Sequence, residues 1–249
     1  MTFSDYYSEK SDDYARYRLS YPAELFSWLA AQAPSRELCW DVATGSGQAA
    51  SGLAEHFSRV VATDASAQQV RMAASDPRIE YRQENANQSS LPDRSVSLIT
   101  VAAAAHWLPL EDFYREVRRV AVPGAVLAMW SYGIAPTAPR EVASLVNQLD
   151  TQILAPHWPP EIQKIRDCYT TLPFPFPELS PPSLQTMLPL EPDQLRGLIR
   201  TWSGSVRYFT STAQDPAASI DDALQALWPT GKREVSWELF FRVGRVSPL

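Results

Sequence analysis

The sequence predicts an α/β protein built on a doubly wound, mostly parallel sheet. Apolar runs alternate with helical patterns from residue 37 onward, which is typical of strands that are covered on both faces. The segment 38–48 passes from such a run into a turn containing Gly45 and Gly47, and then into a helical pattern. An alternating, apolar-rich segment at 234–246 predicts a closing strand.

The predicted elements alternate along the chain. Strands are expected at 38–42, 60–63, 79–82, 95–101, 125–130 and 234–246. Helices are expected at 23–33, 48–57, 66–74, 109–120, 141–154, 193–202, 206–212 and 215–228. The stretch 155–192 holds 10 of the chain's 21 prolines. Because proline lacks a backbone N–H, this stretch is expected to form an irregular insertion or lid outside the sheet.

Composition excludes several classes of protein. The net charge is −6 and no basic run is longer than a pair, so the chain is a poor candidate for binding nucleic acid. Apolar runs are too short for a membrane span, and residues 1–14 are too polar for a targeting signal. Cys39 and Cys168 lack metal-ligand spacing, so we expect no metal, no disulfide framework and a reducing cytoplasm.

Two acidic residues flank the glycine turn and narrow the choice of ligand. Asp64 ends the second predicted strand, about 20 residues after the first motif, where a carboxylate can accept hydrogen bonds from both ribose hydroxyls. Asp41 lies ahead of the glycines, where it would repel a diphosphate and attract an ammonium group. S-adenosylmethionine carries an ammonium and no phosphate. The pair therefore favours this methyl donor over a nicotinamide dinucleotide.

A set of motifs carries a family resemblance over nearly the whole chain. They lie at 14–22, 41–48, 61–66, 84–86, 91–93, 105–107, 113–120, 123–124, 201–203 and 241–245. On these motifs the chain resembles the class I S-adenosylmethionine-dependent methyltransferases, in the small-molecule subgroup of trans-aconitate methyltransferase (methyltransferase type 11 domain). It departs from the family pattern at Ala43, Ser97 and Asn87.

The resemblance implies a Rossmann-like fold. The expected sheet has seven strands and is mostly parallel, with the last strand antiparallel and a lid inserted between the fifth and sixth strands. One methyltransferase domain is expected over 1–249. Within it we expect a helical arm at 1–34, a cofactor-binding core at 35–132, a lid and substrate region at 133–230, and the closing strand at 231–249.

The resemblance also implies where the cofactor binds. Gly45, Gly47 and Asp41 would hold the methionine part, Asp64 the ribose, and the backbone N–H of Ala86 the adenine edge. The full set of expected cofactor residues is Tyr14, Arg18, Asp41, Ala43, Gly45, Gly47, Asp64, Ala65, Gln69, Ala86, Asn87 and Ala102. For the arm residues Tyr14 and Arg18, simple packing and a surface salt bridge are the alternative roles.

Methyl transfer needs alignment and exclusion of water, and it needs a base only when the accepting atom carries a proton. His106 is the candidate catalytic base, because it follows the fourth strand and histidine titrates near neutrality. Ordering its loop or binding the substrate is the alternative. Aromatic residues could wall an acceptor pocket, although core packing is the alternative for each. With His106, the candidates for substrate binding are Trp107, Trp130, Tyr132, Trp158, Trp202 and Tyr208.

The sequence therefore predicts a cytoplasmic enzyme, monomeric or homodimeric, that methylates a small molecule and binds neither nucleic acid nor membrane. The accepting group could be a carboxylate, hydroxyl, ring nitrogen or thiol. Two other classes remain open: an NAD(P)-binding oxidoreductase, and a cofactor-binding partner subunit without activity.

Overall fold

The computed structural model describes residues 19–137 and 139–247. It contains a seven-stranded sheet in the order β3-β2-β1-β4-β5-β7-β6. The strands are β1 (Leu38–Val42), β2 (Arg59–Asp64), β3 (Ile79–Gln83), β4 (Val96–Ala102), β5 (Ala121–Tyr132), β6 (Gln185–Leu190) and β7 (Arg233–Arg245). In the part of the sheet ordered β3-β2-β1-β4-β5, each strand pairs in parallel with its neighbour. β6 and β7 pair with each other in the antiparallel direction. The predicted mostly parallel sheet with an antiparallel end is confirmed.

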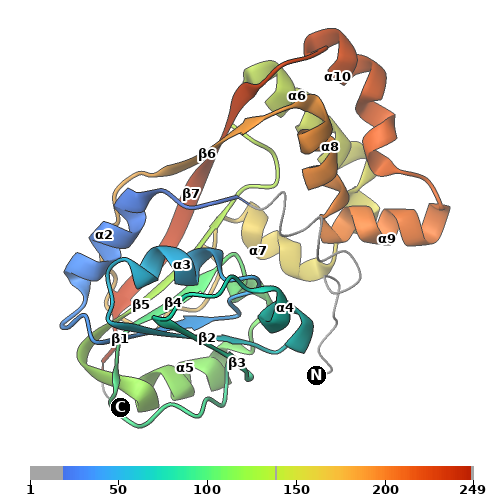
Figure 1. The fold of residues 1–249 in the computed structure, drawn as a ribbon. Coiled ribbons are helices and arrows are strands. Elements are labelled where there is room, and N and C mark those ends of the chain that lie inside the picture. Colours follow the sequence, from blue (N-terminus) through green and yellow to red (C-terminus); the bar gives the residue numbers. More distant parts are fainter. Residues whose placement is uncertain (1–18, 138, 248–249) are drawn as a thin grey trace. The chain divides into compact units, whose positions relative to one another are not determined.

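Helices cover the parallel strands on both sides. The helices are α2 (Ala23–Gln32), α3 (Gln48–Ala54), α4 (Ala67–Met72), α5 (Leu110–Val120), α6 (Arg140–Gln148), α7 (Gln163–Arg166), α8 (Pro192–Arg200), α9 (Ser203–Thr212) and α10 (Asp221–Leu227). Figure 1 shows α3 and α5 on opposite faces of the sheet. In α5 the apolar residues Phe113, Val117 and Val120 are buried at helical spacing. Within the described ranges, no helix has the length and apolarity needed to cross a membrane.

The chain forms two compact units, each assembled from separate segments. The sheet unit comprises 21–131, 167–184 and the residues from 239 onward. The helical unit is built mainly from 132–166 and 185–238. The sheet unit buries most of its central strands, with Trp40 and Leu98 fully buried, and the helical unit has its own core around Ile199, Trp228 and Trp237.

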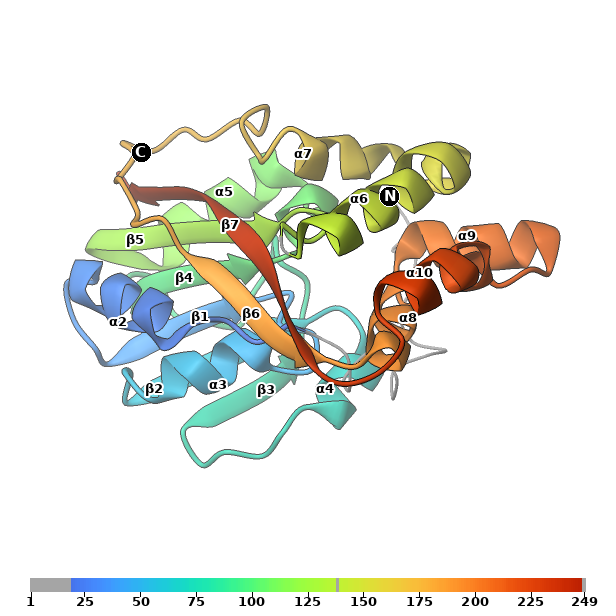
Figure 2. The same ribbon diagram turned by 90° about the horizontal axis from the view of Figure 1, so that it is seen from above.

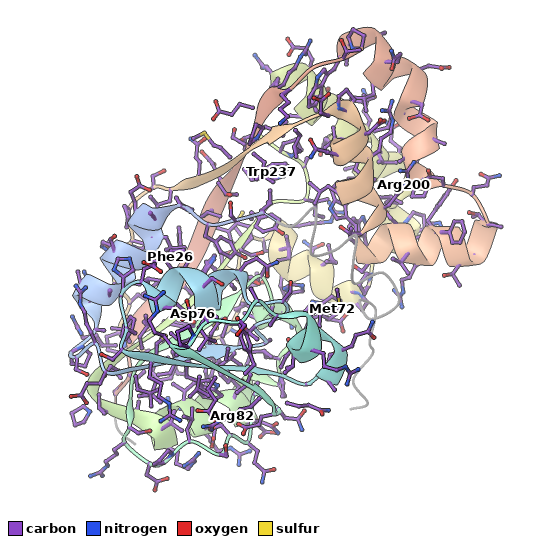
Figure 3. All side chains as sticks on the ribbon, viewed as in Figure 1. Phe26, Met72, Asp76, Arg82, Arg200 and Trp237 are labelled. Carbon is purple, nitrogen blue, oxygen red and sulfur yellow. The ribbon has the colours of Figure 1, made fainter. Side chains whose placement is uncertain are left out.

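A glycine allows α2 to pack closely on α3. A Cβ atom at Gly52 would lie 2.1 Å from Cε2 of Phe26, much closer than atoms can approach. The Phe26 ring, labelled in Figure 3, therefore occupies the space that a side chain at position 52 would need. This contact fixes the first helix against the helix that follows the glycine turn.

One expectation about the proline-rich stretch is wrong. Residues 185–190 form β6 rather than part of an irregular insertion, and β6 lies alongside β7 (Figure 2). Pro189 is tolerated because β6 is the last strand of the sheet, where one row of backbone groups has no strand to pair with. The predicted helix 141–154 also differs, because α6 ends at Gln148 and a π-helix (Leu149–Ile153) continues it.

Candidate functional site

The glycine turn lies where the strand order reverses. β1 pairs with β2 on one side and with β4 on the other, and ligands of doubly wound sheets bind beyond the carboxyl ends of strands at such a point. Ala43, Gly45 and Gly47 have φ angles of +52°, +58° and +90°. Every second residue of the turn is therefore left-handed, and α3 begins directly after it at Gln48. Glycine adopts this conformation without a steric cost, so Ala43 is the only one of the three that carries a Cβ atom in it.

Gly47 is required for two independent reasons. Its φ angle lies in the region that residues with a Cβ atom rarely adopt. In addition, a Cβ atom there would lie only 2.3 Å from Oη of Tyr81, a residue of β3. Burial raises the pKa of Tyr81 to about 12, so the hydroxyl beside the turn stays protonated at neutral pH. A side chain at position 47 is therefore disfavoured both by the backbone conformation and by the neighbouring Tyr81.

Asp64 connects the glycine turn to the start of α4. Its Oδ2 accepts a hydrogen bond from the Gly45 N–H at 2.9 Å, and its Oδ1 accepts one from the Ser66 N–H at 2.8 Å. The residue is 9% exposed. A carboxylate accepts hydrogen bonds through both oxygens, so Asp64 is a residue of the chemical type that can accept from the hydroxyls of a ribose.

Asp41 is completely buried beneath the turn. Its Oδ2 accepts a hydrogen bond from the Thr44 hydroxyl at 2.6 Å, and its Oδ1 accepts one from the Thr100 hydroxyl at 2.7 Å. Burial raises its pKa to about 6, although the two hydroxyl bonds partly oppose this shift. Asp41 is therefore placed as a support of the turn. Its contact with the methionine part of a cofactor stays a prediction.

The other expected cofactor residues differ in exposure. Gln69 in α4 is buried, with its side-chain oxygen near Gly45, whereas Asn87 is exposed in the turn closed by the Asn85–Gln88 bridge. The half-buried positions are Ala43, Ala65, Ala86 and Ala102. Tyr14 and Arg18 lie outside the described residues.

His106 is buried directly after β4. It lies in the short 3₁₀-helix Ala105–Trp107 and is 5% exposed. Its Nδ1 lies 3.0 Å from Oη of Tyr169, which is fully buried. Tyr169 is 63 residues away in the chain and has no motif of its own, so nothing in the sequence pattern indicated it. The ring of Trp107, which is half-buried, lies 4.8 Å from the His106 ring.

Trp130 is packed in the core of the sheet unit. Its side chain is fully buried, and its ring meets Tyr21 edge-on with centroids 5.4 Å apart. Its indole Nε1 has no hydrogen-bond partner among the described residues. In this structure Trp130 has the core-packing role that was the alternative to lining an acceptor pocket. Its contact with a substrate stays a prediction.

The helical unit contains the other predicted aromatic residues and a pocket. The ring centroids of Trp158 and Trp202 lie 6.1 Å apart. The Trp158 ring also packs on Gly204, where an added Cβ atom would lie 2.7 Å from the indole. Trp158 also lines a pocket of about 290 Å³. The other lining residues are Thr151, Ala155, Pro159, Pro160, Ile162, Gln163 and Arg166. Tyr132 and Tyr208 are half-buried in the same unit and pack against its core, without lining this pocket.

Comparison with known proteins identifies the family of this chain. Residues 40–129 match the family model of a methyltransferase domain. A Dictyostelium discoideum protein named as a methyltransferase is 30% identical over 92% of this chain and 88% of its own length. An uncharacterized methyltransferase of Mycobacterium tuberculosis is 30% identical over 86% of this chain and 82% of its own. The solved structure of an Anaeromyxobacter dehalogenans protein named as a type II methyltransferase is 42% identical, covers 93% of this chain and 99% of its own, and superposes with a TM-score of 0.86.

These matches define a methyltransferase on a Rossmann-like fold. The chain belongs to the class I S-adenosylmethionine-dependent methyltransferases, and S-adenosylmethionine is its cofactor. The predicted placement in the trans-aconitate subgroup stays a prediction.

Proposed function

We propose that this methyltransferase acts on a small-molecule acceptor, held largely by residues 133–230. The observation that carries the proposal is the pocket of about 290 Å³ in the helical unit. Its wall combines the apolar surfaces of Trp158, Pro159 and Ile162 with the polar side chains of Thr151 and Gln163. Pockets of roughly 300 Å³ and more with this mixture are typical of small-molecule sites. A carboxylate, hydroxyl, ring nitrogen or thiol remains the candidate accepting group.

The sheet unit fits the cofactor. The left-handed turn has glycine at two of its three left-handed positions, which lets a ligand approach the backbone, and the Asp64 carboxylate is an acceptor of the type that ribose hydroxyls need. When bound, S-adenosylmethionine supplies an electrophilic methyl group. The turn would then fix the methionine part, and Asp64 would orient the ribose, which holds the methyl donor in one geometry.

Calorimetry on Asp64→Asn tests the cofactor site. Replacing the carboxylate by an amide removes a charged acceptor, so we expect the dissociation constant for S-adenosylmethionine to rise at least about tenfold, which is about 1.4 kcal/mol. Asp76→Asn is the matched control, because Asp76 is an aspartate of the same unit that pairs with Arg78. Equal affinity of Asp64→Asn and the unmodified protein would refute the ribose contact.

A panel of acceptors tests the reaction itself. Release of S-adenosylhomocysteine with one class of small molecule, and not with RNA or protein, would support the proposal. Cofactor binding without turnover on any acceptor would favour the inactive partner subunit. Thermal stabilisation by NADH, with none by S-adenosylhomocysteine, would favour the oxidoreductase.

We also propose a cytoplasmic location and a monomeric or homodimeric state. Cys39 and Cys168 are both free thiols, as a reducing compartment would keep them. Light scattering of the purified protein would settle the oligomeric state.

A further inference from the structure

The chain that follows β3 is closed into a turn by its own side chains. The carboxylate of Glu84 accepts hydrogen bonds from the N–H of Ser90 at 3.1 Å and from the Ser90 hydroxyl at 2.5 Å. Between these two residues, Asn85 and Gln88 form an isolated antiparallel bridge, and the Gln88 N–H donates to the Asn85 carbonyl at 3.1 Å. Residues 84–90, here called the 84–90 turn, therefore form a compact loop whose two ends are joined.

The 84–90 turn begins beside Asp64. The Glu84 N–H donates to the Asp64 carbonyl at 3.0 Å, and Asp64 lies opposite Gln83 in the parallel pairing of β2 and β3. Both strands end here, at the edge of the sheet that also carries the glycine turn after β1. A base attached to a ribose on Asp64 would therefore have the 84–90 turn among its nearest neighbours.

Glu116 of α5 holds the second end of the 84–90 turn. Its Oε1 accepts hydrogen bonds from the N–H of Ser89 at 2.7 Å and from the Ser89 hydroxyl at 2.6 Å. Glu116 is only 7% exposed. A charged side chain is buried where it is paired and hydrogen-bonded, so the place of Glu116 on α5 is matched to Ser89.

Arg119 lies one helical turn further along α5 and binds both Glu116 and the chain around Ser89. Its Nε and one terminal nitrogen donate to the two carboxylate oxygens of Glu116, at 2.9 and 2.6 Å. The same terminal nitrogen donates to the Ser89 carbonyl at 3.2 Å. The other terminal nitrogen donates to the Leu91 carbonyl at 2.8 Å and to Asp93 at 2.6 Å. The pair therefore secures the chain from Ser89 to Asp93 against α5.

Glu116 and Arg119 stay charged at neutral pH. Burial alone would raise the pKa of Glu116, but the hydrogen bonds from Arg119 and Ser89 outweigh it and hold this pKa below its usual value. The bonds to Glu116 in turn raise the pKa of the Arg119 guanidinium. The bonds from this pair to the backbone are therefore charge-assisted, and such bonds are shorter and stronger than those between neutral groups.

We propose that Glu116 and Arg119 are positioning residues for the cofactor, which hold the 84–90 turn in the conformation that recognises the adenine base. The proposal rests on the proposed ribose contact of Asp64, which brings the base to this turn. Glu116 and Arg119 act through the turn, by ordering backbone groups such as the N–H of Ala86 before the cofactor arrives. Binding then costs less, because a loop that is already ordered loses little conformational freedom.

Calorimetry with two ligands tests whether the pair serves recognition of the base. The ligands are S-adenosylhomocysteine and S-inosylhomocysteine, whose bases differ by an amino group in place of a carbonyl. An ordered set of hydrogen-bonding groups rejects the wrong base, so we expect the unmodified protein to prefer the adenine ligand at least about tenfold. In Glu116→Ala the Kd for S-adenosylhomocysteine should rise about tenfold, and the preference should fall below about threefold.

Three further variants separate positioning from general damage to α5. Glu116→Gln keeps an oxygen that can accept from Ser89, so it should retain most of the preference. Arg119→Ala should reduce the preference as Glu116→Ala does, and it carries the test if Glu116→Ala does not fold, because the Arg119 side chain is 35% exposed. Val117→Ala is the matched control. Val117 is fully buried between the two residues on α5, so this variant loses packing without losing a bond to the turn, and its preference should not change.

The outcomes that contradict the proposal are distinct. An unmodified protein that binds both ligands equally, or a folded Glu116→Ala that keeps the full preference, would overturn it. An equal loss of preference in Val117→Ala would also overturn it, since the effect would then belong to the stability of α5.

Asp64→Asn, measured beside these variants, keeps the result separate from the proposed ribose contact. Unchanged affinity in Asp64→Asn would refute that contact. Weaker binding by Asp64→Asn, together with an unchanged preference in Glu116→Ala, would overturn only the positioning role. None of these measurements uses an acceptor, so they are decisive even if the proposed class of substrate is wrong.

Discussion

At the scale of single residues, Asp41 places a titratable group in the centre of the sheet unit. Burial raises its pKa from 3.8 to about 6, so folding favours the protonated form. The contribution of this residue to stability is therefore fully favourable below about pH 4 and is lost as the pH rises toward 6. A pKa that differs by about two between the folded and unfolded states corresponds to about 3 kcal/mol of unfolding free energy.

Urea unfolding of the unmodified protein and of Asp41→Asn tests this effect. Because asparagine does not titrate, the difference in unfolding free energy isolates Asp41. Relative to Asp41→Asn, the unmodified protein should lose on the order of 3 kcal/mol between pH 4 and pH 7. A difference that stays constant across this range would show that Asp41 does not titrate as its burial implies.

Ala43 is the second residue whose local energy can be measured. The left-handed conformation costs an alanine about 1–2 kcal/mol in steric energy. A glycine avoids this cost, but it lowers the unfolding free energy by about 0.4–1 kcal/mol because the unfolded chain gains conformational freedom. Ala43→Gly should therefore raise the unfolding free energy by about 0.5–1 kcal/mol. Ala73, with a φ of −66°, is the matched control, and Ala73→Gly should lower it. Destabilisation by both changes would mean that Ala43 is not strained.

At the scale of elements, the contact between α2 and α3 can be tested by changing both partners. Gly52→Ala would ordinarily stabilise a helix by about 1 kcal/mol. Here the added atom meets the Phe26 ring, so we expect a net loss of about 1–3 kcal/mol in unfolding free energy. In a Phe26→Leu background the loss should shrink. An identical loss in both backgrounds would exclude the ring contact as its cause.

The elements also show what the sequence could predict. β1, β2 and β4 were predictable because continuous apolar runs bury both faces of a strand, and the glycine turn because its residues lie together in the chain. β6 was not, because whether Pro189 is tolerated depends on its place at the sheet edge. Tyr169 was not either, because its partner His106 is brought to it only by the completed fold.

At the scale of the whole molecule, β7 has a consequence for synthesis. The helical unit ends at Glu238 and the sheet unit resumes at Leu239, in the middle of this 13-residue strand. The ribosome makes the chain from its N-terminus, and both units contain part of β7. Neither unit can therefore be completed before β7 has been made. Partly made chains would expose the edge of β5, a site for aberrant pairing, and would depend on chaperones at that stage.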